Sequence, residues 1–431
     1  MHYDLVHPRD LIALIMRRVY RYGMTTTSGG NLSVRDENGD IWITPAGTDK
    51  GSLEWDDVVH VRPDGSMTGA HHPSSELPFH KAIYAARPDF AGIVHAHPGA
   101  LVSFSTVRRV PPIRIIPQAQ DVCGCIGYAA YAMPGSETLG ENIAKAFRNG
   151  CDCVLMENHG VVCGGASLLQ AFQRFETLEF CARLALKATI LGDYRELDDE
   201  QLAVFHHTRN DLPEFNPDTH SSEEKALRRH ICEITHRAYD QQLMTSTEGV
   251  VSVRLGSGQF LITPTGHDRR LIEIGDVVLI REGKRERGKL PSRSVLLHDR
   301  IYRDHPAVTA IVSAQAPNAT AFSVGGRTFD TRTIPESYIL LREVPKLPYG
   351  PQFTDEARVS EAIGDDTPVV LLENDAVLTT GASLLEAYDR LEVAEFSARS
   401  LIDAGLLGGA VAMGEQEVTE IRRHFIDRQR A

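Results

Sequence analysis

The feature that most constrains this 431-residue chain is an internal duplication, because long stretches of the first half return in order in the second. The first copy reads IWITPAGTDK at 41–50, and the second reads FLITPTGHDR at 260–269. Further along, ENHGVVCGGASLLQ at 157–170 returns as ENDAVLTTGASLLE at 373–386. The offset between matching positions stays between 216 and 220 residues, so the copies are collinear. Because the repeat is about 180 residues long, it is a duplicated domain and not a solenoid of short units.

The two copies are expected to form two domains, residues 1–207 and residues 222–431. Between them lies a polar run with two prolines, which is typical of a linker. Apolar residues recur at helix and strand spacing in the same order in each copy. We predict strands at Asn31–Val34, Ile41–Thr44, Gly92–His97 and Cys153–Met156, and helices at Arg9–Tyr22, Ser167–Ile190 and Ser383–Ala404. This mixture indicates layered domains of the α/β or α+β type.

Charge and composition restrict the partners. The chain has 45 Lys and Arg against 58 Asp and Glu, a net charge of −13, so no basic surface is expected for nucleic acid or anionic lipid. No stretch approaches eighteen consecutive apolar residues, and the N-terminus lacks the pattern of a secretory signal. The seven cysteines form an odd, scattered set, which is typical of reduced thiols. We therefore expect a cytoplasmic protein with a small-molecule substrate and neither nucleic-acid nor membrane partners.

Two histidines stand two residues apart in the predicted strand GIVHAHP, at His95 and His97. Residues i and i+2 of a strand point to the same face, so both imidazoles project together. Two imidazoles on one face are two thirds of a three-histidine zinc site. For an isolated pair the alternative is two solvent-facing side chains on a half-buried strand.

A third histidine, His159, follows the apolar strand before it and immediately precedes a glycine. The duplication links it to the first two. In the second copy the matching positions of the three histidines are Ser313, Gln315 and Asp375, although the surrounding residues persist. Loss of all three together indicates one shared function, which we interpret as metal binding.

A carboxylate, Glu76, lies in the stretch HHPSSELPFH. Beside a metal it would serve as a ligand or as a general acid/base if its pKa is near neutrality. The alternative is an exposed glutamate at a helix start, with Ser74 or Ser75 as the N-cap. The second copy has Ser294 at this position, so the carboxylate is lost there as well.

A glycine-rich turn, Ser28-Gly29-Gly30-Asn31, leads into the first predicted strand. Backbone N–H groups of such turns bind anions, and Asn31 adds a side-chain amide. The second copy reads Glu248-Gly249-Val250 here, which places a carboxylate where an anion would bind and removes the asparagine.

Five motifs occur in order along the first copy: SGGNLS, TPAG, PSSE, HAH and ENHG. Together they resemble the class II aldolase/adducin family, and fuculose-phosphate-aldolase-like members in particular, over residues 8–205. Residues 222–410 resemble the same fold with the site erased. The resemblance implies the α/β class, with two tandem layered α-β-α domains, each a mainly antiparallel sheet flanked by helices. It also implies a divalent metal, usually Zn²⁺, held by His95, His97 and His159.

The resemblance also implies roles for the remaining candidates. The position matching Glu76 is the acid/base of the family's aldolases. The positions that line the phosphate pocket are Gly30, Asn31, Gly47, Ser74 and Ser75. Two departures stand out: Ala46 replaces a serine before its glycine, and the tyrosine used as second acid is not evident in 113–121. Asp121 and Tyr131 are the candidates to replace it.

These residues favour a metal-dependent lyase that cleaves a C–C bond in a small hydroxy-carbonyl compound, a sugar phosphate by the family's example, by retro-aldol chemistry through a metal-stabilised enediolate. A metal-dependent decarboxylase on the same scaffold and a 4-epimerase remain alternatives. A non-catalytic adducin-like scaffold is the alternative of another class, and the intact site of the first copy speaks against it. Family aldolases assemble as four domains, so we expect a homodimer that forms a pseudo-tetramer of domains.

Overall fold

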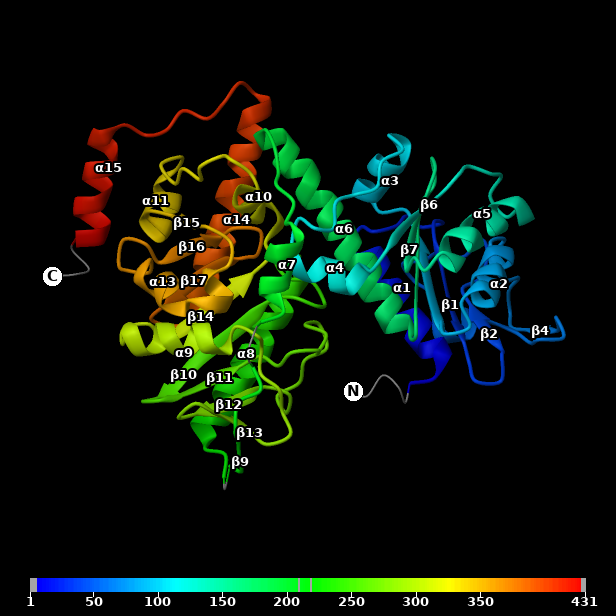
Figure 1. Ribbon diagram of the computed structural model, residues 1–431, viewed down its shortest axis with the longest axis horizontal. Helices are drawn as coiled ribbons and strands as arrows, with labels where there is room; N and C mark the ends of the chain where they lie inside the picture. Colours follow the sequence, from blue (N-terminus) through cyan, green and yellow to red (C-terminus); the bar gives the residue numbers. More distant parts are fainter. Residues whose placement is uncertain (1–5, 208–209, 218, 428–431) are drawn as a thin grey trace. The chain divides into compact units, whose positions relative to one another are not determined.

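The computed structural model describes residues 6–207, 210–217 and 219–427, and each copy is built around its own sheet (Figure 1). Close contacts divide the chain into two compact units. One unit comprises Met1–Ile113 with Gln118–Arg183, and the other Arg114–Pro117 with Leu184–Ala431. The division falls within one long helix, so it precedes the linker that we predict at 207–222. Among the described helices, none has the length and apolar character that a bilayer span requires.

The first unit contains an eight-stranded sheet in the order β4-β3-β2-β1-β5-β8-β7-β6. Neighbouring strands are antiparallel except for the parallel pair β6–β7. The strands are β1 (Asn31–Arg35), β2 (Ile41–Ile43), β3 (Val59–Val61), β4 (Met67–Thr68), β5 (Gly92–Ala96), β6 (Ile126–Ala129), β7 (Cys153–Met156) and β8 (Gly160–Gly165). The predicted strand at 92–97 ends one residue early, because Pro98 has no N–H to continue the ladder.

Helices cover both faces of this sheet (Figure 1). One face packs on α2 and α5, and their apolar side chains share a core with strand residues such as Ile43, Ile93 and Val154. On the other face α1 contacts β1 and β2. The helices are α1 (Pro8–Arg21), η2 (Trp55–Asp57), α2 (Leu77–Ala86), α3 (Gly99–Thr106), α4 (Pro117–Cys123), α5 (Glu137–Arg148) and α6 (Leu168–Leu191).

The second unit repeats this strand order and adds one strand at the edge: β15-β16-β17-β14-β10-β11-β12-β13-β9. Its strands are β9 (Glu214–Phe215), β10 (Val250–Gly256), β11 (Gln259–Ile262), β12 (Val278–Arg281), β13 (Lys284–Glu286), β14 (Ala310–Ala314), β15 (Lys346–Leu347), β16 (Val369–Leu372) and β17 (Val377–Gly381). The added strand β9 lies inside the stretch that we expected to be only a linker. Two tandem, mainly antiparallel α/β layers are therefore confirmed.

The helices of the second unit follow the same plan, with a long helix, α14, after the last strand. They are α7 (Asp199–Phe205), α8 (Ser222–Asp240), α9 (Val295–Asp304), α10 (Pro317–Val324), α11 (Pro335–Leu341), α12 (Pro351–Thr354), α13 (Glu356–Glu361), α14 (Leu384–Leu406), α15 (Glu415–Ile421) and η3 (Arg422–Ile426). The predicted long helices agree with α6 and α14 to within two residues. All seven cysteines are free thiols, and six of them are buried.

Candidate metal centre

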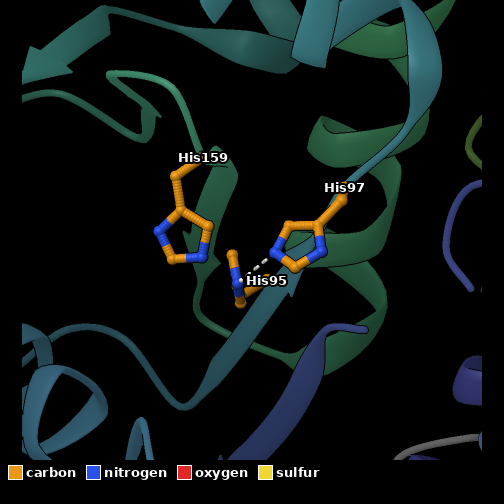
Figure 2. A group of neighbouring side chains, drawn as sticks. All are labelled: His95, His97 and His159. Carbon is orange, nitrogen blue, oxygen red and sulfur yellow. Dashed lines mark hydrogen bonds between the residues drawn. The ribbon is translucent and has the colours of Figure 1, made fainter. Parts of the chain in front are cut away.

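Three histidine side chains converge at the end of β5 (Figure 2). The strand carries His95, His97 follows its last residue, and His159 lies in the turn between β7 and β8. One nitrogen from each ring lies within 4.8 Å of the others. The turn requires the glycine after the third histidine, because a Cβ at Gly160 would lie 2.6 Å from the carbonyl oxygen of Ala96.

Hydrogen bonding orients the first histidine. The Nδ1–H of His95 donates to the carbonyl oxygen of Val161 at 2.9 Å, so its Nε2 faces the other rings. That Nε2 lies 3.1 Å from Nε2 of His97. Two nitrogens on a tetrahedral zinc ion, at about 2.0–2.1 Å each, are separated by about 3.3 Å. A backbone carbonyl on the far nitrogen is the usual second partner of a ligating histidine. The donor set therefore fits a divalent metal.

A buried carboxylate completes the group. Oε2 of Glu76 lies 3.1 Å from Nε2 of His95, and Oε1 lies 3.4 Å from Nε2 of His159. The residue precedes α2 as its N-cap position, but its side chain makes no capping bond and the residue is only 7% exposed. The interpretation of Glu76 as an exposed glutamate at a helix start is therefore wrong.

Burial controls the protonation of the imidazoles. It lowers the pKa of His97 to about 3 and that of His159 to about 4, and the neighbouring charge of His95 acts in the same direction. Both rings are thus neutral at pH 7, the form that binds metal. Burial alone would raise the pKa of Glu76. However, the charge and hydrogen bond of His95, the hydrogen bond of Asn31 and the charge of His159 together hold it well below its usual value. Glu76 is therefore an ionised carboxylate at neutral pH, and its pKa does not lie close to neutrality.

A chain of hydrogen bonds behind the carboxylate is a feature that sequence reasoning missed. Nδ2 of Asn31 donates to Oε2 of Glu76 at 2.7 Å, and Oδ1 of Asn31 accepts from Nε2–H of His80 at 2.5 Å. His80 Nδ1 then accepts from the hydroxyl of Ser33 at 2.7 Å, which lies 2.8 Å from the hydroxyl of Tyr84. Burial lowers the pKa of His80 to about 3, so this ring is a neutral relay that orients Asn31.

A comparison of the two copies could have revealed these hydrogen-bonded residues. The second copy keeps the same three residues as Ser252, His298 and Tyr302, with contacts of 2.7 Å from the serine hydroxyl to both partners. It has Val250 in place of Asn31, and the buried Nε2 of His298 has no hydrogen-bond partner. The histidine is thus part of the scaffold, and only Asn31 connects it to the site.

The five predicted phosphate-pocket residues occupy two neighbouring loops and the start of β1. Gly30 has φ +74°, and a Cβ there would lie 2.7 Å from the carbonyl oxygen of His95, so only glycine fits. The buried Ser74 accepts a 3.3 Å bond from the N–H of Glu76, and Ser75 is exposed. Gly47, with φ +66°, lies in the loop whose Pro45 pairs with Pro73. Asn31 binds protein groups at both ends of its amide, Glu76 through Nδ2 and His80 through Oδ1. Phosphate binding by this set stays a prediction.

The two candidates for a second acid are less constrained. Tyr131 lies in the loop after β6 and is 57% exposed, and its backbone N–H donates to Glu157 at 3.0 Å. Asp121 lies in α4. Their catalytic roles stay predictions.

Comparison with known proteins identifies the fold family. The family model of the Class II Aldolase and Adducin N-terminal domain matches residues 10–186 and again residues 229–402. The chain belongs to this family.

Relatives in the family include two enzyme types. L-fuculose phosphate aldolase of Methanocaldococcus jannaschii is 35% identical over 172 residues, which is 40% of this chain and 92% of that protein. The 3-oxo-tetronate 4-phosphate decarboxylase of Haemophilus influenzae is 32% identical over 180 residues, 41% of this chain and 85% of that protein. A solved structure of L-fuculose 1-phosphate aldolase is 32% identical, with a TM-score of 0.42, and covers 46% of this chain and 93% of its own.

The matching place in the second class II aldolase domain is a small pocket of about 60 Å³. Its lining includes Ser313, Gln315 and Asp375 in place of the three histidines. An ion pair of 2.9 Å joins Arg293 to Glu248 there. The Arg293 side chain thus supplies the positive charge in this pocket, and no histidine among the lining residues can bind a metal.

Asp375, at the matching position of His159, predicts a loss of folding stability that depends on pH. Burial, together with the charge of Glu248, raises the pKa of Asp375 to about 7, although Arg293 and a 3.3 Å bond from Gln352 oppose the shift. An acid whose pKa is raised in the folded state makes the protein less stable as the pH rises from the pKa of the unfolded state toward 7. We compare the free energy of unfolding of the variant Asp375→Asn with that of the parent. The advantage of the variant should be larger at pH 8 than at pH 5, by on the order of 2 kcal/mol. Urea unfolding at both pH values measures this, and an equal difference at both would contradict it.

Proposed function

We propose that the first domain is a divalent-metal-dependent lyase, with Zn²⁺ as the first candidate, that cleaves a C–C bond in a small phosphorylated hydroxy-carbonyl compound. The observation that carries the proposal is the position of Glu76. Its ionised carboxylate contacts both His95 and His159 and is oriented by Asn31. A base held against a three-histidine site is what proton transfer next to a carbonyl requires. Similarity to two kinds of enzyme that act on phosphorylated substrates supports it.

A metal bound by the three histidines would stabilise negative charge on the carbonyl and hydroxyl oxygens of the substrate. The protein's own residues would move the protons and bind the phosphate. In cleavage, a hydroxyl loses its proton to the second acid/base, its carbon leaves as an aldehyde, and the electron pair of the broken bond stays on the carbon beside the ketone. In the condensation direction the ionised carboxylate of Glu76 removes a proton from that carbon, and in cleavage Glu76 delivers to it a proton taken up from water. Gly30, Gly47, Ser74 and Ser75 would hold the phosphate through N–H and hydroxyl groups.

Decarboxylation is the second candidate, favoured by the similarity to the Haemophilus influenzae decarboxylase. There the bond to a carboxyl group breaks, CO₂ leaves with no aldehyde, and the electron pair stays on the same carbon. Glu76 would relay a proton from water to that carbon, as in cleavage. The proposal includes a homodimer. Each chain supplies two domains of this fold, so two chains would form a pseudo-tetramer of four domains.

Product analysis tests the proposal. Protein loaded with zinc is incubated in turn with L-fuculose 1-phosphate and with a 3-oxo-tetronate 4-phosphate. We expect aldehyde release from the ketose phosphate, and CO₂ from the second substrate would favour the decarboxylase. The variant His159→Ala should lose the activity, while Ser313→Ala, at the matching position of His95 in the second domain, should keep it. Turnover of neither substrate class would argue for the adducin-like scaffold.

A further inference from the structure

Six of the seven cysteines belong to the first domain, and two of them bring their sulfur atoms together. Sγ of Cys125 lies 2.6 Å from Sγ of Cys151, although both residues are free thiols. A disulfide bond is about 2.05 Å long, so the two sulfurs need to approach by only about 0.5 Å to be joined. The pair is peculiar to the first copy, because the matching positions in the second copy are Glu343 and Thr367.

Hydrogen bonds hold the backbone on both sides of this cysteine pair. The carbonyl oxygen of Cys125 accepts from the N–H of Asp152 at 3.0 Å and from that of Cys153 at 3.4 Å. The carbonyl oxygen of Cys151 accepts from Nη1 of Arg87 at 2.8 Å, and Nη2 of the same arginine pairs with Asp152 at 3.2 Å. The two cysteines are thus kept side by side by contacts that do not involve their sulfurs. A bond between the sulfurs would leave these contacts in place.

The two thiols differ in their access to solvent. Cys125 is exposed, whereas Cys151 is buried. Burial, with the hydrogen bond and the charge of Cys125, raises the pKa of the Cys151 thiol to about 12. Cys151 therefore stays protonated at neutral pH, and Cys125 is the sulfur that a dissolved oxidant reaches first. One accessible thiol beside one buried partner is the arrangement that lets a first oxidation be followed by a second.

The other cysteines of the first domain have no such access. Cys153 and Cys163 lie opposite each other on β7 and β8. Both are 0% exposed, as are Cys123 and Cys181, so a dissolved oxidant does not reach them. Metal binding does not explain the exposed pair either. Among the described residues, the three histidines are the only group of potential ligands large enough for a metal, so the pair has no third ligand.

We propose that Cys125 and Cys151 form a site of reversible oxidation, at which hydrogen peroxide converts the two thiols into an intrachain disulfide. The thiolate of Cys125 attacks one oxygen of the peroxide, the O–O bond breaks, and hydroxide leaves with the proton that Cys125 released, as water. The product is a sulfenic acid on Cys125. The sulfur of Cys151 then attacks that of Cys125, the S–O bond breaks, and the hydroxide takes the proton of the Cys151 thiol. Two thiols lose two electrons in total, and one peroxide becomes two waters.

The disulfide would fasten β6, an edge strand of the sheet, to its neighbour β7. Cys125 and Cys151 stand just before the first residues of these two parallel strands. His159 follows the opposite end of β7, so oxidation would leave the three histidines in place. The site is therefore independent of the metal centre and of the proposed lyase reaction.

Thiol counting and peptide mapping of the full chain test the proposal. The fully reduced protein is treated with a small excess of hydrogen peroxide, then unfolded and alkylated with iodoacetamide. We expect two of the seven thiols to escape alkylation, and both to return after dithiothreitol. After cleavage by trypsin, the peptide 115–145 should be joined to the peptide 149–174 by a disulfide.

Variants assign the two sulfurs, because each of these peptides contains more than one cysteine. Cys125→Ser should abolish the joined peptides, while Cys123→Ser, the matched control on the same peptide, should keep them. Cys151→Ser should stop the reaction at the sulfenic acid of Cys125, which dimedone traps. Its matched control is Cys153→Val, which introduces the residue that the second copy has as Val369 and should keep the disulfide.

Four outcomes would overturn the proposal. They are seven alkylated thiols in the peroxide-treated parent, joined peptides in Cys125→Ser, loss of the joined peptides in either matched control, and a disulfide between two chains in place of the one within a chain. The count of thiols in the parent needs no substitution, so the test does not depend on whether any variant folds.

Discussion

Replacing Glu76 by glutamine is expected to lower kcat of the proposed lyase reaction by about 10²–10⁴-fold, the usual contribution of a positioned acid/base. Glutamine keeps the shape and can still bond to Asn31, but it cannot accept or return a proton. Because the three histidines remain, the metal should stay bound, and KM should change far less than kcat. Steady-state kinetics with elemental analysis of the same preparation measures both quantities.

The chain supplies its own matched control for this variant. Ser294 is the N-cap residue of α9, as Glu76 is of α2. Replacing Ser294 by alanine should leave kcat unchanged. If Glu76→Gln retains more than half of the parental kcat, proton transfer is carried by another group. If it instead loses its metal, the carboxylate is a ligand and not the base.

Much of the fold could be predicted because the duplication supplies an internal comparison. Residues that persist in both copies belong to the scaffold, and the repeated order of strands follows from them. Residues that vanish together, namely His95, His97 and His159, belong to the site, and the structure brings them within 4.8 Å of one another. The strand periodicity explains why the first two point to the same place.

The parts that could not be predicted depend on contacts between distant segments. His80 persists in both copies, yet only the folded sheet shows that it reaches the site through Asn31, 49 residues away. The burial of Glu76 likewise arises from packing against β1 and β5 and leaves no mark in the local sequence. The division of contacts within α6 also follows from packing, because a continuous helix carries no composition change at that point.

Metal binding should be confined to the first domain, and its loss should be complete in His97→Ala. Removing one of the three imidazoles leaves two protein nitrogens, and because Glu76 is assigned as the base and not as a ligand, the metal is expected to be lost. Structural zinc sites bind their metal by about 10–16 kcal/mol. A site of comparable affinity keeps its metal through dialysis, so the stoichiometry is a stable quantity. Gln315→Ala is the matched control, because Gln315 occupies the position of His97 in the second domain.

Elemental analysis of metal per chain, after zinc loading and removal of the excess, therefore tests the central claim most directly. We predict about one zinc per chain in the parent protein and in Gln315→Ala, and none in His97→Ala. Absence of metal from the parent would contradict the three-histidine assignment and the lyase with it. A value near two, with Gln315→Ala reduced to one, would show that the second domain also holds a metal.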